Sequence, residues 1–345
     1  MATPSLFGIE HSNRDFSERD AWGKNVFNSA FPVALCNYFL DRKIMANYLD
    51  VNKKGFGISE ISIHDVYGGN SYSKLFFDFE TDFTPHSNIL KNSEKLSIDL
   101  VIKKNPELTP VLPLEVKLTT LPDNSTANLP DDKQSTELVI RTPTIGSLAC
   151  SIATNSGNEI KEIFSSHGIN DFSERNLKQN RTVIKSTLQQ ILSKCHINSK
   201  PLLLQPVWKT IGKSTILAEN CLDVFIWSDM GLLHFILEQM KTEHGSKVTR
   251  QTRTAIWIFK MLHDFSRNGC LSLQETIDSL TFQTKNDKAF SSTDTHRFMK
   301  CEHLTKPRIM RSEIRSIILG GGEKMLSPER RFDGILQANS SELFK

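Results

Sequence analysis

LSIDLVI at residues 96–102 and VLPLEVKL at residues 111–118 decide the fold. Both runs are mostly aliphatic, and both have the length and the two-residue periodicity of β-strands. The connection KKNPELTP at residues 103–110 is short and contains two prolines, so the two strands are predicted to form an antiparallel hairpin.

Charged side chains interrupt this apolar pattern on one face of the predicted hairpin. In residues 111–118 the aliphatic side chains alternate onto one face, and Glu115 and Lys117 point to the other. Asp99 points away from the aliphatic face of its own strand, so it is expected to converge with Glu115. Two carboxylates and a lysine are the groups that metal-dependent phosphodiester hydrolysis requires, because carboxylates bind Mg²⁺ and a lysine stabilises charge or activates water.

An acidic residue two positions before a lysine is common in proteins. The prediction of a catalytic site at Glu115 and Lys117 therefore depends on the apolar strand in which this pair lies. The other such pairs are Asp41/Lys43, Asp131/Lys133 and Glu159/Lys161, and none lies within an apolar strand. Charged residues seldom occupy such strands without a reason. Glu80, in the strand-like run LFFDFETDF at residues 75–83, is a further acidic candidate near the metal. The alternative is a solvent-exposed sheet face that carries an ordinary Glu–Lys pair.

Asp99 followed by Glu115-Val116-Lys117 resembles the PD-(D/E)xK nuclease signature, with Ile98 where the motif name has proline. Longer stretches resemble the type II restriction endonucleases of the HindVP/HgiDI family, over about residues 30–330. These stretches are LPLEVKLTTLPDNST (112–126), DDKQSTELVIRTPTIGSLACSIA (131–153) and PVWKTIGKSTILAENCLDVFIWSD (206–229).

This resemblance implies a fold and an activity. The expected fold is a restriction-endonuclease-like core of the α/β (α+β) class, with a central mixed sheet flanked by helices and with additional C-terminal helices. The expected activity is Mg²⁺-dependent cleavage of double-stranded DNA, with Asp99, Glu115 and Lys117 as catalytic residues and Asp99 and Glu115 as metal ligands. The resemblance also implies a cognate DNA methyltransferase and the target GRCGYC.

The remaining pattern gives the expected organisation of the chain. Residues 1–30 are polar, and residues 31–345 are expected to form one nuclease domain, with a sheet core at about 58–228 and a helical, basic part at about 229–345. Further strands are predicted at 58–67, 136–142, 201–208 and 221–228. Helices are predicted from Pro32 through Leu49, from about 144, and at 175–195, 230–241, 252–266, 272–281 and 307–319.

Composition and charge exclude several classes of protein. The 345 residues are 38% hydrophobic, which suffices for a core, and no apolar run approaches the roughly 18 residues of a membrane span. No secretory signal is visible at the N-terminus, and the six cysteines show no zinc-site spacing, so a reducing cytoplasm is expected. Residues 241–345 carry 18 Lys and Arg against 12 Asp and Glu, whereas the rest of the chain carries 24 against 27.

The basic C-terminal third is typical of a surface that contacts DNA phosphates. The candidate DNA contacts are Arg141, Lys209, Lys213, Lys247, Arg250, Arg253, Arg308, Arg311 and Arg315. Ordinary solvated surface is the alternative for each cluster. A homodimer is expected, since the chain has one catalytic set and a palindromic target has two-fold symmetry. Met230, Leu233, Phe235 and Met240 are candidates for its interface.

Two classes of function remain open at this point. One is a metal-dependent, sequence-specific DNA endonuclease. The other is a non-catalytic DNA-binding or nuclease-like structural protein whose acidic and lysine residues are only surface features. The intact set of Asp99, Glu115 and Lys117 favours the endonuclease.

Overall fold

A computed structural model describes most of the chain up to residue 291. The described residues are 9–15, 24–117, 137–138, 141–166, 168–207, 210–211, 214–215, 223–240, 242, 248, 250–280 and 290–291. Within them, no helix is long and apolar enough to cross a membrane.

A seven-stranded mixed sheet forms the centre of the structure, in the order β2-β1-β10-β7-β5-β4-β3. Its strands are β1 (Met45–Asn52), β2 (Gly55–Ser62), β3 (Leu75–Asp82), β4 (Ser97–Lys104), β5 (Thr109–Val116), β7 (Pro201–Val207) and β10 (Asp223–Ser228). The pairs β1–β10 and β5–β7 are parallel, and the other neighbours are antiparallel. Two small pairs lie apart: β6 (Glu137–Leu138) with β11 (Phe290–Ser291), and β8 (Thr210–Ile211) with β9 (Ser214–Thr215).

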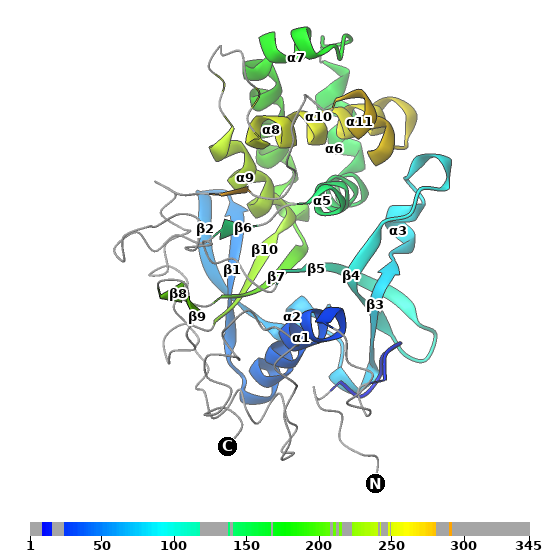
Figure 1. Cartoon of the computed structure of the whole chain (residues 1–345), viewed down its shortest axis with the longest axis vertical. Coiled ribbons are helices and arrows are strands. Elements are labelled where there is room, and N and C mark those ends of the chain that lie inside the picture. The colour runs from blue at the N-terminus through cyan, green and yellow to red at the C-terminus, as the bar shows by residue number, and fades with distance from the viewer. Residues whose placement is uncertain are drawn as a thin grey trace.

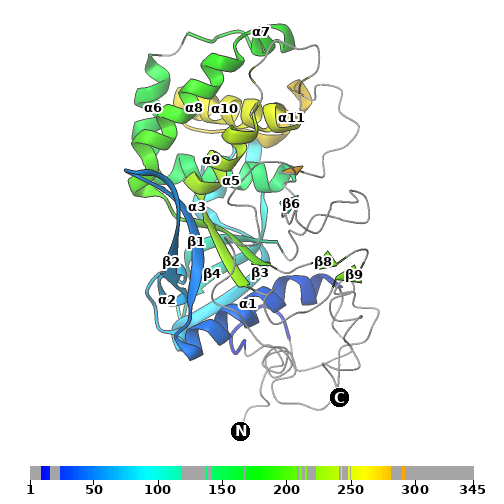
Figure 2. The same cartoon turned by 90° about the vertical axis from the view of Figure 1, so that its left-hand side faces the viewer.

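Helices cover the two faces of this sheet unequally (Figures 1 and 2). Most lie on one face: α5 (Thr142–Asn155), α6 (Gly157–Ser165), α7 (Glu174–Gln179), α8 (Arg181–Cys195), α9 (Asp229–Gln239), α10 (Arg250–Asn268) and α11 (Leu273–Ser279). The opposite face carries α1 (Lys24–Arg42) and α2 (Ile63–Val66). The short α3 (Thr84–Ser87) and the 3₁₀ turns η2 (Tyr72–Lys74), η3 (Lys91–Ser93) and η4 (His196–Asn198) connect these elements. The layers make the α/β fold that the sequence predicts.

The side chains of the strands separate into two cores. Leu100, Leu114 and Leu204 are buried with residues of α1. Val101 and Leu203 are buried with residues of α5, α8, α9 and α10. The period-2 alternation of the strands therefore divides their residues between the two helical layers, as expected for a sheet that is covered on both sides.

The hairpin predicted for residues 96–102 and 111–118 is confirmed. β4 and β5 pair in antiparallel register, with Leu100 opposite Leu114 and Val101 opposite Pro113. The runs at 75–83, 201–208 and 221–228 form β3, β7 and β10. The helices predicted at 230–241, 252–266 and 272–281 are α9, α10 and α11. The helix predicted at 307–319 lies outside the described residues.

Two predictions about the N-terminal half are wrong. The helical pattern was expected to run from Pro32 through Leu49, but Pro32 lies inside α1 and the helix ends at Arg42. Lys43 then adopts a positive φ of 55°, which breaks the helix, and β1 follows. The sheet therefore begins well before residue 58. The strand predicted at 58–67 is β2 only as far as Ser62, whose hydroxyl caps α2.

Two further predictions need correction. The segment 175–195 forms two helices, because Asn180 separates α7 from α8 with non-helical dihedral angles. The apolar residues of α9 that were candidates for a dimer interface are fully or almost fully buried in the core of the chain. Apolar residues occur on all sides of α9 because the helix packs against β1 and β10 and also against α8 and α10.

The described part of the N-terminal segment packs on the sheet, and the described cysteines are free thiols, as the sequence predicts. Residues 9–15 are not a detached polar segment: Asn13 bonds to the backbone of Phe79 in both directions, and Ile9 is buried. This segment runs along the edge strand β3. Cys36, Cys150, Cys195 and Cys270 are free thiols, and burial raises the pKa of the first three. The remaining two cysteines lie outside the described residues.

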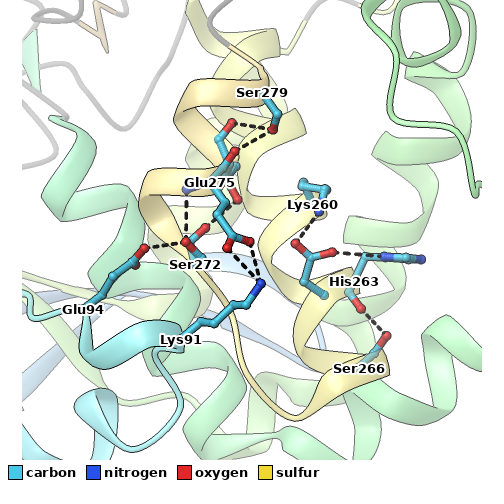
Figure 3. A network of polar contacts seen from close by, with 10 residues as sticks. Lys91, Glu94, Lys260, His263, Ser266, Ser272, Glu275 and Ser279 are labelled. Carbon is cyan, nitrogen blue, oxygen red and sulfur yellow. Dashed lines mark hydrogen bonds and ion pairs between the residues drawn. The ribbon is translucent and has the colours of Figure 1, made fainter.

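Polar contacts fasten α11 to the segment that leads into β4 (Figure 3). Ser272 caps α11 by accepting from the backbone N–H of Glu275, as the capping-box spacing predicts. The Glu275 carboxylate does not complete the box but pairs with Lys91 at 2.8 Å. The Glu94 carboxylate accepts bonds from the Ser272 hydroxyl and, at 2.9 Å, from the Leu273 N–H. α11 is thus anchored to the segment that leads into β4.

Candidate active site

Asp99, Glu115 and Lys117 come together at the carboxyl end of β5. The Lys117 ammonium lies 2.8 Å from Oε2 of Glu115 and 3.1 Å from Oδ2 of Asp99. The backbone of Lys117 donates to the carbonyl of Leu204 on β7 at 2.9 Å, so β5 continues its pairing past the last residue assigned to it. The same-face convergence expected from strand alternation is therefore present in the structure.

Neighbouring backbone and side-chain donors fix both carboxylates. The Val116 N–H donates to Oδ2 of Asp99 at 2.9 Å, which ties the Asp99 side chain to the adjacent strand. The Thr144 hydroxyl, in the first turn of α5, donates to Oε2 of Glu115 at 3.2 Å. The sequence alone does not assign Thr144 to the site, because nothing in the spacing shows that the start of α5 reaches β5.

Burial acts on the protonation of Glu115 and Lys117. Glu115 is only 3% exposed, and burial raises the pKa of its carboxyl, although Lys117 and Thr144 act in the opposite direction. Burial also disfavours the charged form of Lys117, but the two carboxylates outweigh this effect and raise the pKa of the ammonium. Asp99 has the most exposed side chain of the three, at 36%. The site is therefore open to solvent on the Asp99 side and dry at Glu115.

The donor set fits a hard divalent cation that keeps part of its water shell. Two carboxylates of adjacent strands already enclose one positive charge, the Lys117 ammonium. Among the residues that the structure describes, no group of three His, Cys, Asp or Glu side chains could hold a metal. Mg²⁺ commonly binds through one or two carboxylates together with waters and substrate phosphates, and it seldom uses a cage made only of protein ligands. The two carboxylates of this site fit that kind of coordination.

Within the described residues, no hydrogen bond or ion pair joins Glu80 to Asp99, Glu115 or Lys117. It lies between Phe79, which pairs with Leu100, and Thr81, which pairs with Ile98, and so stands across the ladder from Asp99. Its φ is +52°, however, and its carboxylate pairs with Arg14 at 2.9 Å with half of the side chain exposed. The Glu80 carboxylate is thus engaged by Arg14 of the N-terminal segment, and its place near the metal stays a prediction.

Comparison with known proteins adds the family to this geometry. Residues 22–344 match the HindVP restriction endonuclease family. The chain belongs to this family. It is 44% identical to the probable type II restriction enzyme HindVP of Haemophilus influenzae, over 99% of this chain and 95% of the relative. It is 38% identical to the type II restriction enzyme HgiDI of Herpetosiphon aurantiacus, over 96% of this chain and 95% of the relative.

Membership in the HindVP family confirms the resemblance on which the sequence predictions drew and places the chain among the restriction endonucleases. The relatives are type II restriction enzymes. No solved structure matches the chain, so the site geometry comes from this structure alone.

The candidate DNA contacts of this HindVP family member are only partly described. Arg141 is exposed and occupies the N-cap position of α5, three residues before Thr144. It therefore lies at the helix end that contacts Glu115. Lys209, Lys213, Lys247, Arg308, Arg311 and Arg315 lie outside the described residues, and for Arg250 only its place at the start of α10 is described.

Arg253 does not have the placement that its predicted role requires. It is only 4% exposed and its guanidinium lies 5.0 Å from the centre of the Trp257 ring, on the same helix. α10 turns this position toward the core, and the i, i+4 spacing brings the two side chains together. We therefore remove Arg253 from the candidate phosphate contacts.

Proposed function

We propose that the protein is a type II site-specific deoxyribonuclease that hydrolyses phosphodiester bonds in double-stranded DNA, with Asp99, Glu115 and Lys117 as its catalytic residues. The observation that carries the proposal is the single ammonium held between two strand-borne carboxylates, at 2.8 and 3.1 Å. Membership in a family of restriction endonucleases supports the same activity.

Each residue of the chain has a distinct part in this proposal. Asp99 and Glu115 would hold Mg²⁺, which supplies Lewis-acid polarisation of the phosphate and a water of lowered pKa when it is bound. The Val116 N–H and the Thr144 hydroxyl keep the two carboxylates oriented. Lys117 has three N–H donors, and it stabilises the negative charge that develops on the phosphate or orients the attacking water.

The target and the biological setting are proposed on the family resemblance. The sequence GRCGYC is the proposed recognition site, with cleavage of both strands. A cognate DNA methyltransferase would protect the host genome, and the enzyme would work in the cytoplasm, where the DNA is. The exposed Arg141 at the N-cap of α5 is the described residue best situated to contact DNA near the site.

The decisive test is DNA cleavage by the purified protein and its variants. Plasmid DNA that carries GRCGYC should be cut with Mg²⁺ and should stay intact with a chelator. Asp99→Ala, Glu115→Ala and Lys117→Ala should each reduce the cleavage rate by roughly 10²-fold or more. Digestion of a known genome followed by sequencing of the ends would show whether the cuts fall at GRCGYC. Near-normal cleavage by a folded Glu115→Ala protein would refute the assignment.

A further inference from the structure

Gln205 on β7 is the buried polar neighbour of the proposed catalytic residues. β7 runs parallel to β5, with Leu203 opposite Glu115 and Leu204 opposite Val116, and the Lys117 N–H continues this ladder to Leu204. Because side chains alternate along a strand, Gln205 lies on the same face as Glu115 and beside Lys117. It is fully buried.

The orientation of the Gln205 amide follows from its partner Trp227. The indole Nε1 of Trp227 lies 3.0 Å from Oε1 of Gln205. An indole N–H only donates, so the amide atom that faces it has to be the carbonyl oxygen. The Gln205 NH₂ group therefore points away from Trp227, and within the described structure its nitrogen is buried without a hydrogen-bond partner.

A buried donor without an acceptor is rare and destabilising in a folded protein. Lys117 cannot satisfy it, since an ammonium has no acceptor, and no bond joins Gln205 to Glu115 within the described residues. The missing partner is thus an acceptor on this face of the sheet, near the proposed catalytic lysine. A phosphate oxygen of DNA has that chemistry.

We propose that the Gln205 NH₂ group donates a hydrogen bond to a non-bridging oxygen of the scissile phosphate, beside Lys117. The inference rests on the proposed nuclease function. It includes a movement: the oxygen reaches the buried amide when Lys117 leaves the two carboxylates and turns to the phosphate. Gln205 would then be a catalytic residue, and Trp227 would be the positioning residue that holds its amide.

Two substitutions at Gln205 separate this role from a purely structural one. Gln205→Glu keeps the volume and the oxygen that accepts from Trp227 but lacks the NH₂ donors. Gln205→Met removes both polar groups. Gln190→Met, at an exposed position of α8, is the matched control. Single-turnover cleavage of a one-site duplex in Mg²⁺ and duplex affinity in Ca²⁺ are measured for each protein, together with circular dichroism and thermal unfolding.

Both Gln205 variants are expected to cleave roughly 10- to 100-fold more slowly, as for the loss of a donor to a reacting oxygen, with affinity within about threefold of the unchanged protein. Gln190→Met should leave both quantities unchanged. Folded Gln205 variants that cleave at the wild-type rate would overturn the inference, because a Gln205 that serves only as the partner of Trp227 would affect only stability.

If neither Gln205 variant folds, Trp227→Phe is the deciding test. It keeps the NH₂ donors of Gln205 but removes the indole N–H that holds the Gln205 amide in place. It should slow cleavage at unchanged affinity, and an unchanged rate would overturn the inference.

Phosphorothioate substrates give a second measurement on the same atom. Sulfur in place of the contacted oxygen should slow the wild-type protein and should add little to the defect of Gln205→Glu. If the sulfur substitution and Gln205→Glu slow cleavage by fully additive amounts with both phosphorothioate diastereomers, the contact is contradicted. Lys117→Ala separates the two proposals: if it is inactive while Gln205 variants are normal, only the Gln205 inference fails. If the unchanged protein cuts no DNA, the proposed function itself fails.

Discussion

The hydroxyl of Thr144 donates to Oε2 of Glu115 over 3.2 Å, in a part of the structure where both residues are buried. This contact joins the first turn of α5 to the carboxyl end of β5. The same oxygen accepts from the Lys117 ammonium at 2.8 Å. The start of α5 and the proposed catalytic lysine therefore hold one carboxylate oxygen between them, and the orientation of Glu115 depends on both.

Thr144→Val should lower the cleavage rate while leaving the fold intact. Valine has nearly the same shape as threonine but cannot donate to the carboxylate, and a hydrogen bond to a charged group contributes on the order of 1.5–3 kcal/mol. A loss of about tenfold or more in cleavage rate is expected. Thr144→Ser, which keeps the hydroxyl, is the control and should retain most of the rate. Equal rates for the Val and Ser variants would show that the contact does not matter for catalysis.

Arg141→Gln should weaken DNA binding and reduce its dependence on salt. Arg141 is exposed at the N-cap of α5, next to the proposed site. If it contacts one phosphate, the slope of log affinity against log salt should fall by about one unit. Lys161→Gln, an exposed residue of α6, is the control. A slope that is the same for both variants would place Arg141 outside the DNA contacts.

The local pattern predicted those parts of the site that lie within two adjacent strands. Asp99 and Glu115 converge because strand alternation and a short hairpin leave little freedom. Thr144 and Gln205 escaped notice because their positions depend on the crossover that brings α5 and β7 back to β5. The predicted DNA contact of Arg253 is wrong because the sequence pattern of a basic helix is the same whether the side chain faces solvent or packs on Trp257.

The fold shows the same division between local and non-local information. The Ser272 cap of α11 is predictable because the signal spans only Ser272 to Glu275. The end of α1 is not, since the apolar residues from Leu35 to Leu49 recur at helical spacing on both sides of Lys43. The apolar surface of α9 suggested an interface, but the burial of Met230 and Phe235 within the chain depends on contacts with distant elements.

A single-site duplex should bind two copies of the chain. The proposed site is one Asp99–Glu115–Lys117 set per chain, and a double-strand cut at a palindrome requires one set for each strand. The stoichiometry should be measured in Ca²⁺, which is expected to permit binding without cleavage, by sedimentation of the protein–DNA complex. One chain per duplex that still cuts both strands in one binding event would contradict the dimer.

Glu94→Ala should destabilise the fold without altering the chemistry of the site directly. The Glu94 carboxylate accepts from the Ser272 hydroxyl and from the Leu273 N–H at 2.9 Å, so its loss leaves the start of α11 without these partners. A decrease of roughly 1–3 kcal/mol in the free energy of unfolding is expected from denaturant titration. Ser279→Ala, at the exposed end of the same helix, should cost much less. An equal effect of the two substitutions would show that the link to Glu94 contributes little.

Asp229→Asn should change how stability depends on pH. Oδ1 of Asp229 accepts from Ser199 at 2.7 Å, from the Lys200 N–H at 3.1 Å and from the Met230 N–H at 2.7 Å, and Oδ2 accepts from Ser151 at 3.2 Å. Burial nevertheless dominates and raises the pKa of Asp229 from 3.8 to about 6. The folded protein therefore keeps a proton that the unfolded chain releases, and the free energy of unfolding falls as pH rises through this range.

The substitution removes this contribution because asparagine stays neutral at every pH. Its carbonyl oxygen can accept the bonds that Oδ1 accepts, and the Ser151 hydroxyl can turn to accept from the new NH₂ group. At pH 8 the variant should exceed the unchanged protein in free energy of unfolding by up to about 3 kcal/mol, since each pKa unit corresponds to about 1.4 kcal/mol. The two proteins should converge as pH falls toward 4. Denaturant titrations at pH 4, 5, 6, 7 and 8 measure the difference directly, and a difference that is constant over this range would show that Asp229 does not titrate between 3.8 and 6.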